Sequence, residues 1–128
     1  MNNNNNNMNT ILIVDDETKI RNMYHKYLSA KGFNILEASN AMEAYNILMR
    51  KNTNPVDIIL LDINMPETNG EILYNVTKLI HKNFKIIVSS VYPIDDQMEI
   101  IKGAAAYFDK SHNLTELIET IKIILEKN

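Results

Sequence analysis

The sequence has no cysteine, no tryptophan, and only three glycines and three prolines in 128 residues. The lack of cysteine excludes disulfide frameworks, cysteine–zinc sites and thiol catalysis. The glycines, Gly32, Gly70 and Gly103, are too far apart to form a phosphate-cradling loop. Apolar runs such as Ile58–Leu61 are far shorter than the roughly 20 residues that a membrane span requires.

An excess of positive charge is also missing. Thirteen Lys and Arg residues stand against 16 Asp and Glu residues, for a net charge of −3. Because a nucleic-acid-binding surface needs a basic stripe, we expect no direct contact with nucleic acid. Asn2–Asn7 occupies the place of an apolar N-terminal segment, so we expect no signal peptide. These features predict a cytoplasmic protein without membrane contact.

The composition is sufficient for one packed domain. Hydrophobic residues make up 45% of the chain and charged residues 23%, and the length fits a single domain. The asparagine run has no apolar side chain to bury and cannot offset its own ordering entropy. We therefore expect a disordered, Asn-rich tail over residues 1–8 and one domain over residues 9–128.

Within the domain, short apolar segments alternate with helical patterns. The expected strands are Ile11–Val14, Phe33–Ala38, Val56–Leu61, Ile86–Val88 and Ala105–Phe108. Helical patterns follow each of them, and Asn40 before Glu43 and Asn113 before Glu116 have the spacing of helix N-caps. Strands that are apolar on both faces are typical of a parallel sheet covered by helices on both sides. The sequence predicts a three-layer α/β sandwich of five strands and five helices.

Polar side chains stand at the ends of four of these strands. They are Asp15 and Asp16, Asp62, Ser89 and Ser90, and Asp109 and Lys110. Ligands of parallel sheets bind at the carboxyl ends of the strands. Carboxylates about 4 Å apart repel by on the order of 4 kcal/mol at an effective dielectric constant near 20. A cation removes that cost, and an oxygen-only set favours Mg²⁺. In the alternative reading, the first two aspartates only open a helix as N-terminal acids.

Asp57 belongs to the third apolar segment but stands at its start. Parallel strands begin at the edge of the sheet opposite to their carboxyl ends. Asp57 therefore cannot join the acidic group around Asp62, and we expect its side chain to be solvated.

The ordered set of motifs resembles the receiver domain of bacterial-type two-component response regulators. The matching residues are Ile11–Asp16, Ile59–Pro66 with Gly70, the serines at the end of the fourth strand, and Lys110. The resemblance covers nearly the whole chain, from about Asn9 to Asn128. It implies the flavodoxin-like (βα)5 fold, with a five-stranded parallel sheet of order 2-1-3-4-5.

The resemblance also implies a role for each strand-end residue. Asp62 would be the phosphoryl acceptor, a carboxylate nucleophile that forms an acyl phosphate. Asp15, Asp16, Asp62 and the backbone carbonyl of Asn64 would bind Mg²⁺. Lys110 would pair with the phosphoryl oxygens.

A hydroxyl and an aromatic residue would form the family's switch. The spacing from Asp62 puts the phosphoryl-contacting hydroxyl at Ser90, whereas counting back from Lys110 allows Ser89; Ser90 is the expected residue. Tyr107 matches the aromatic residue that turns inward when this hydroxyl moves. The alternative for Tyr107 is a half-buried tyrosine on an edge strand.

By this resemblance, the chain is a phosphoacceptor switch. A histidine kinase or histidine phosphotransfer protein would donate the phosphoryl group. The signal would reach a downstream protein through the face made by the fourth helix, the fifth strand and the fifth helix. Such a domain is not an enzyme beyond its own phosphorylation and dephosphorylation. The chain could act alone or be part of a longer regulator.

Two other functions use related features. A phosphatase of the haloacid-dehalogenase type also phosphorylates an Asp at the end of a parallel strand. It carries a second Asp two residues later as general acid, and Asn64 occupies that position here. A pseudo-receiver keeps the fold for protein contacts without phosphorylation, but the complete set of Asp15, Asp16, Asp62 and Lys110 argues against it.

Overall fold

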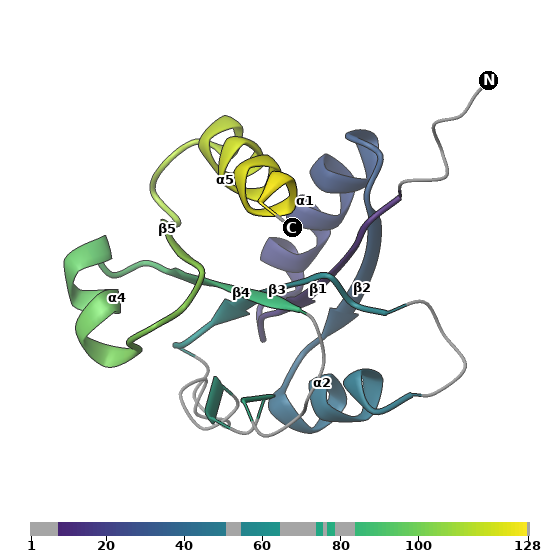
Figure 1. Cartoon of the computed structure of the whole chain (residues 1–128), viewed down its shortest axis with the longest axis horizontal. Coiled ribbons are helices and arrows are strands. Elements are labelled where there is room, and N and C mark those ends of the chain that lie inside the picture. The colour runs from purple at the N-terminus through teal and green to yellow at the C-terminus, as the bar shows by residue number, and fades with distance from the viewer. Residues whose placement is uncertain (1–7, 51–54, 65–73, 76, 79–83, 128) are drawn as a thin grey trace.

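The computed structural model describes residues 8–50, 55–64, 74–75, 77–78 and 84–127. Its centre is a sheet of five parallel strands in the order β2-β1-β3-β4-β5 (Figure 1). The strands are β1 (Thr10–Val14), β2 (Asn34–Ala38), β3 (Ile58–Asp62), β4 (Lys85–Ser90) and β5 (Ala106–Asp109). This order confirms the predicted parallel α/β architecture of the flavodoxin-like type.

Helices cover both faces of the sheet. Those with complete bounds are α1 (Thr18–Ala30), α2 (Ala41–Leu48), α4 (Ile94–Ile100) and α5 (Leu114–Glu126). In Figure 1, α1 and α5 lie on one side of the sheet, α2 lies on the other, and α4 stands beside β5. None of the described helices has the length and apolar character needed to cross a membrane.

Two of the expected segments fall mainly outside the described residues. The helix predicted after the third strand is described only at 74, 75, 77 and 78, where Tyr74, Asn75 and Thr77 are helical. The expected N-terminal tail lies outside the description except for the exposed Met8. The motif residues Met65, Pro66 and Gly70 also lie outside the described ranges.

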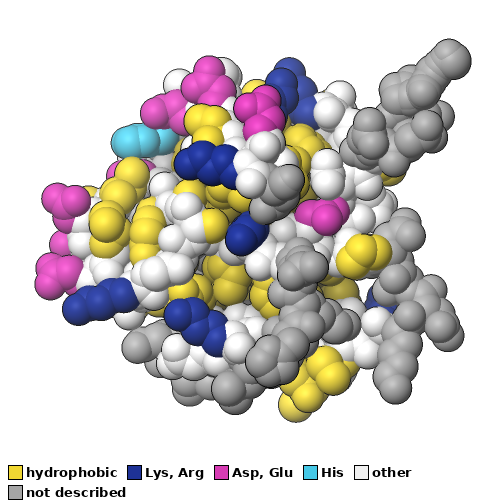
Figure 2. Space-filling view, in the orientation of Figure 1, with side chains coloured by type: hydrophobic (Ala, Val, Ile, Leu, Met, Phe, Trp, Pro, Cys, Tyr) yellow, Lys and Arg dark blue, Asp and Glu magenta, His cyan; other side chains and the backbone are white. Residues whose placement is uncertain are grey.

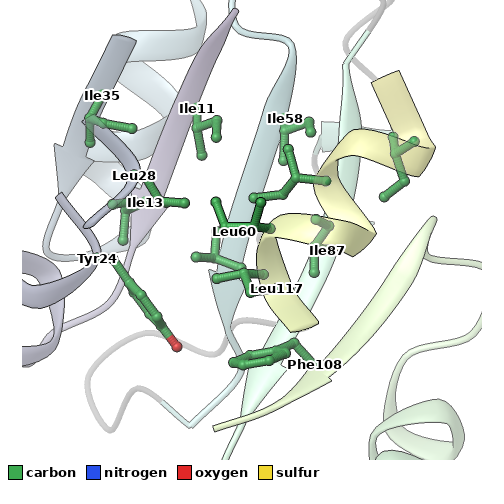
Figure 3. Packing of buried hydrophobic residues seen from close by; sticks show 13 residues of the cluster. Ile11, Ile13, Tyr24, Leu28, Ile35, Ile58, Leu60, Ile87, Phe108 and Leu117 are labelled. Atoms are coloured by element: carbon green, nitrogen blue, oxygen red, sulfur yellow. The ribbon is translucent and has the colours of Figure 1, made fainter. Parts of the chain in front are cut away.

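The sheet is apolar on both faces because each face supports its own core. Alternate residues of the central strands pack with Ala44 and Leu48 of α2 on one side. The residues between them pack on the other side with Tyr24 and Leu28 of α1 and with α5, as Figure 3 shows. All five residues of β1 and all five of β3 are buried. This two-sided burial explains the unbroken apolar runs in the sequence.

Both predicted helix caps are present. The Asn40 side chain accepts a hydrogen bond from the Glu43 backbone N–H at 2.9 Å, at the start of α2. The Asn113 side chain accepts from the Glu116 N–H at 3.1 Å, at the start of α5. Each cap satisfies a backbone donor that the first helical turn leaves unpaired.

The expectation that Asp57 is solvated is wrong. Asp57 is half-buried, and its Oδ2 atom accepts a hydrogen bond from the Thr10 backbone N–H at 2.8 Å. Its own backbone joins the same edge: the N–H donates to Thr10, and the carbonyl accepts from Lys85, each at 2.9 Å. Thr10 is only 2% exposed, so its N–H needs a protein acceptor. Asp57 therefore ties together the starts of three strands.

We expect the substitution Asp57→Ala to lower the free energy of unfolding by about 1–3 kcal/mol, because it leaves the buried Thr10 N–H without its acceptor. Urea denaturation followed by circular dichroism measures this change. Asp57→Asn is the matched control, since its side-chain oxygen can still accept, and it should cost clearly less. Equal stability of the wild type and Asp57→Ala would contradict this role.

Candidate functional site

The predicted strand-end residues meet at one edge of the sheet. Asp62 ends β3 and pairs in register with Ser89, and Ser90 of β4 pairs with Asp109 of β5. Lys110 follows directly. The central strands β1 and β3 are neighbours, and the chain leaves β1 toward β2 on one side before it returns to β3 on the other. The edge is thus the point where the strand order reverses, which is the usual place for a ligand.

Three aspartates form an acidic group at this point. Asp15, Asp16 and Asp62 can each offer a carboxylate oxygen so that the three atoms lie within 4.8 Å of one another. Asp15 and Asp62 are buried, with 1% and 3% exposed, whereas Asp16 is exposed. At such separations each pair of charges repels by about 3–4 kcal/mol at an effective dielectric constant near 20. A set of carboxylate oxygens of this kind suits a hard divalent cation.

Lys110 supplies the positive charge that faces the two buried carboxylates. Its Nζ atom donates a hydrogen bond to Asp15 Oδ2 at 2.7 Å and lies 3.4 Å from Asp62 Oδ2. Burial alone would lower the pKa of Lys110. The hydrogen bond to Asp15 and the negative charges of Asp62 and Asp15 outweigh burial and raise this pKa above its ordinary value. Lys110 is therefore held as an ammonium ion.

The negative charge of Asp62 is only partly compensated by its neighbours. Burial raises the pKa of Asp62, because the protein hydrates its negative charge poorly. The Asn64 backbone N–H, which donates to Asp62 Oδ1 at 2.9 Å, and the Lys110 charge oppose this rise without cancelling it. The carboxylate is thus a group whose charge a further cation would stabilise.

The two serines at the end of β4 have different surroundings. The Ser90 hydroxyl donates a hydrogen bond to the side-chain oxygen of Asn64 and accepts one from the Tyr92 N–H at 3.0 Å. The Ser89 hydroxyl instead lies 3.3 Å from the Tyr24 hydroxyl, in the core layer between the sheet and α1. Figure 3 shows that this tyrosine hydroxyl lies at the end of the apolar cluster where Phe108 also lies. The Ser90 hydroxyl therefore contacts Asn64, which follows β3, whereas the Ser89 hydroxyl contacts Tyr24 of α1.

Tyr107 lies half-buried on β5 and faces the loop after α4. Its Oη atom donates to the Ile101 carbonyl at 2.7 Å and accepts from the Ala104 N–H at 3.2 Å. The ring packs against the core on the α2 side of the sheet. In this arrangement the Tyr107 hydroxyl hydrogen-bonds to the backbone of Ile101 and Ala104, a contact that the sequence patterns did not predict.

Sequence reasoning also missed Gln97. This residue of α4 is fully buried, and its amide nitrogen donates to the carbonyls of Tyr92 and Phe108 at 2.8 and 3.0 Å. A signal was available, because Gln97 stands three residues after Ile94 and four before Ile101, on the apolar stripe of the predicted helix. A polar residue on such a stripe indicates a buried hydrogen-bonding role.

Comparison with known proteins gives one consistent result. The family model described as "Response regulator receiver domain" matches residues 11–122. Sporulation initiation phosphotransferase F of Bacillus subtilis is 28% identical over 114 residues, which cover 88% of this chain and 90% of that protein. The transcriptional regulatory protein SrrA of Staphylococcus aureus is 37% identical over 122 residues, 93% of this chain but 48% of that protein. The chain thus spans about half of the regulator's length.

Solved structures show the same fold. A receiver domain protein from Methanospirillum hungatei, described as CheY-like, has a TM-score of 0.82 at 28% identity and covers 94% of this chain and 95% of its own. The response regulator protein TrrA from Thermotoga maritima, solved in complex with Mg(2+)-BeF, has a TM-score of 0.78 at 32% identity. That match covers 91% of this chain and 99% of TrrA.

We expect a divalent cation to stabilise the fold through the acidic group. At a Mg²⁺ concentration about 100 times the dissociation constant, the stabilisation is about 2.7 kcal/mol, or on the order of 10 °C in melting temperature. Asp16→Asn should lose more than half of this rise, because it removes one carboxylate ligand. Asp95→Asn, an exposed change on α4, is the matched control and should keep the full rise. Equal rises in all three proteins would exclude a metal site at Asp16.

Proposed function

The chain belongs to the response regulator receiver domain family, and from this premise we propose that it is a phosphoacceptor switch in which Asp62 receives a phosphoryl group from a histidine kinase or a histidine phosphotransfer protein. Receiver domains are signalling domains. One observation carries the assignment to Asp62: this buried carboxylate lies 3.4 Å from the Lys110 ammonium, at the strand end where Asp15 and Asp16 gather.

In the proposed reaction, a carboxylate oxygen of Asp62 attacks the phosphorus atom of a phosphohistidine. An O–P bond forms, the P–N bond breaks, and the donor imidazole leaves with the bonding electron pair. The Asn64 N–H holds one carboxylate oxygen at 2.9 Å, so the side chain is oriented before the donor arrives. Lys110 adds a positive charge beside the attacking group. Catalysis of this kind consists mostly of positioning and electrostatic stabilisation.

Mg²⁺ is the cation that we propose for this site. Asp15, Asp16 and Asp62, with the backbone carbonyl of Asn64, would hold it, and their all-oxygen donor set fits its preference. When bound, Mg²⁺ neutralises charge on the transferring phosphoryl group. The relative TrrA, which was solved with Mg(2+)-BeF, supports the choice of metal.

Ser90 and Tyr107 are the proposed switch residues. The Ser90 hydroxyl sits on Asn64, two residues after Asp62, and is free to turn toward a phosphoryl group once that contact breaks. Tyr107 would change its hydrogen bonds with the loop after α4 in response. A population shift between two such arrangements would carry the signal.

The proposed output surface is the face formed by α4, β5 and α5. Met98 and Ile100 of α4 are 48% and 38% exposed, and they stand among the exposed acids Asp95, Asp96 and Glu99. Figure 2 shows acidic side chains at the left edge of the molecule, where Figure 1 places α4. An exposed mixture of apolar and acidic side chains fits a protein partner better than nucleic acid or an anionic membrane surface. We propose that the contact with this partner takes place in the cytoplasm. We also propose that the domain spans residues 9–128.

We expect acetyl phosphate or phosphoramidate with Mg²⁺ to add one phosphoryl group, visible by intact mass spectrometry. The product should be stable in acid and labile in base, as an acyl phosphate is. Asp62→Asn should abolish it, whereas Asp57→Asn, at the opposite edge of the sheet, should leave it unchanged. Phosphorylation that persists in Asp62→Asn would refute the assignment of the acceptor.

The two serines provide a second, matched test. Ser90→Ala should slow phosphorylation of Asp62 by on the order of tenfold or more, because it removes a hydroxyl donor to the phosphoryl oxygens. Ser89→Ala should leave the rate within about twofold, because the Ser89 hydroxyl lies on Tyr24 instead. Initial rates with phosphoramidate decide between them, and the opposite order of effects would transfer the role to Ser89.

A further inference from the structure

Gln97 is a buried polar residue of α4 that borders the candidate site without belonging to it. Its amide nitrogen donates to the carbonyl oxygens of Tyr92 at 2.8 Å and Phe108 at 3.0 Å, and it lies 3.5 Å from the carbonyl oxygen of Ser90. All three neighbours are acceptors, so only the NH₂ group can face them. The orientation of the amide is thereby fixed.

The carbonyl groups that Gln97 contacts belong to the two segments that carry site residues. The Tyr92 N–H donates to the Ser90 hydroxyl at 3.0 Å. Phe108 stands two residues before Lys110, whose backbone N–H donates to the Ser90 carbonyl at 2.8 Å. One amide group therefore joins α4 both to the segment of the candidate hydroxyl and to the segment of the candidate ammonium ion.

The same amide also carries a cost. The Gln97 Oε1 atom is buried, and no donor in the described part of the chain reaches it. A buried acceptor without a donor destabilises a fold. Methionine would fill a similar volume without this cost. Glutamine therefore contributes two donated hydrogen bonds at this position, which an apolar residue cannot make.

Other side chains hold the segment that follows α4. Tyr107 Oη donates to the Ile101 carbonyl at 2.7 Å, and Tyr74 Oη donates to the Lys102 carbonyl at 3.1 Å. α4 itself has only seven residues, so it has few helical hydrogen bonds of its own. The position of α4 depends on such side-chain contacts, and Gln97 makes those that face the site.

We propose that Gln97 is a positioning residue that couples α4 to the state of the site, an inference that rests on the phosphorylation of Asp62 proposed above. A phosphoryl group on Asp62 attracts the Ser90 hydroxyl, which then leaves Asn64. The Tyr92 N–H follows this hydroxyl, and the Tyr92 carbonyl transmits the displacement through Gln97 to α4. Gln97 touches none of the reacting atoms, so it acts on the position of α4 and not on phosphoryl transfer.

The first test observes Gln97 directly in the wild-type chain. Gln97 is the only glutamine, so selective ¹⁵N labelling of glutamine side chains gives one identifiable amide pair. With Mg²⁺ and phosphoramidate we expect both of its proton resonances to shift, and we expect no shift with phosphoramidate in Asp62→Asn. Unchanged resonances in a sample that intact mass shows to be phosphorylated would overturn the proposal.

The second test removes the coupling. Gln97→Met deletes both donors and keeps an unbranched side chain, and Lys102→Arg, an exposed change just after the same helix, is the matched control. Phosphorylation should change amide hydrogen exchange in α4 by roughly tenfold in the wild type and in Lys102→Arg, as expected for the rearrangement of two hydrogen bonds. In Gln97→Met this change should be lost while Asp62 is still phosphorylated. An undiminished response of α4 in Gln97→Met would contradict the coupling.

The possible failures are distinguishable. A wild-type chain that takes up no phosphoryl group refutes the proposed function, and the role of Gln97 falls with it. A phosphorylated wild type with unchanged exchange in α4 refutes only the role of Gln97. If Gln97→Met does not fold, the resonances of the wild-type amide decide the question.

Discussion

The site depends on one ammonium group that must serve two buried carboxylates. Lys110 Nζ hydrogen-bonds to Asp15 at 2.7 Å and lies 3.4 Å from Asp62, and the exposed Asp16 adds a third negative charge nearby. One positive charge cannot balance three negative ones, two of which are buried and poorly hydrated. The folded chain therefore holds an unbalanced negative charge that a divalent cation would relieve and that the proposed phosphoryl transfer would rearrange.

The rest of the fold fixes the positions of these charged groups. The central strands are buried on both faces, so their register is fixed and their carboxyl ends project the polar residues to one edge. Asp57 secures the opposite edge through Thr10, and the capped helices close the two cores. Tight packing cannot deform continuously, so a change at the strand ends would reach the neighbouring segments, as proposed above for α4.

Most of the fold, and the meeting of the strand-end residues at one edge of the sheet, could be predicted from the sequence. Unbroken apolar strands, N-cap spacings and polar strand ends are local patterns with a direct physical meaning. The hydrogen-bond partners of Asp57 and Gln97 could not be predicted, because only the fold brings the backbone groups of Thr10 to Asp57, and those of Tyr92 and Phe108 to Gln97. The surroundings of Ser89 and Ser90 were ambiguous for a related reason: adjacent residues of a strand face opposite sides, and only the three-dimensional register tells them apart.

The most direct measurement of the central claim is a crystal structure of the chain with Mg²⁺ and beryllium fluoride, which mimics a phosphoryl group. If the excess charge at the site is the basis of its function, the fluoride adduct lies on an Asp62 oxygen, Mg²⁺ lies between the aspartates, and Lys110 Nζ has left Asp15 for a fluorine atom. An adduct elsewhere, or a Lys110 that stays on Asp15 beside an unmodified Asp62, would contradict the account.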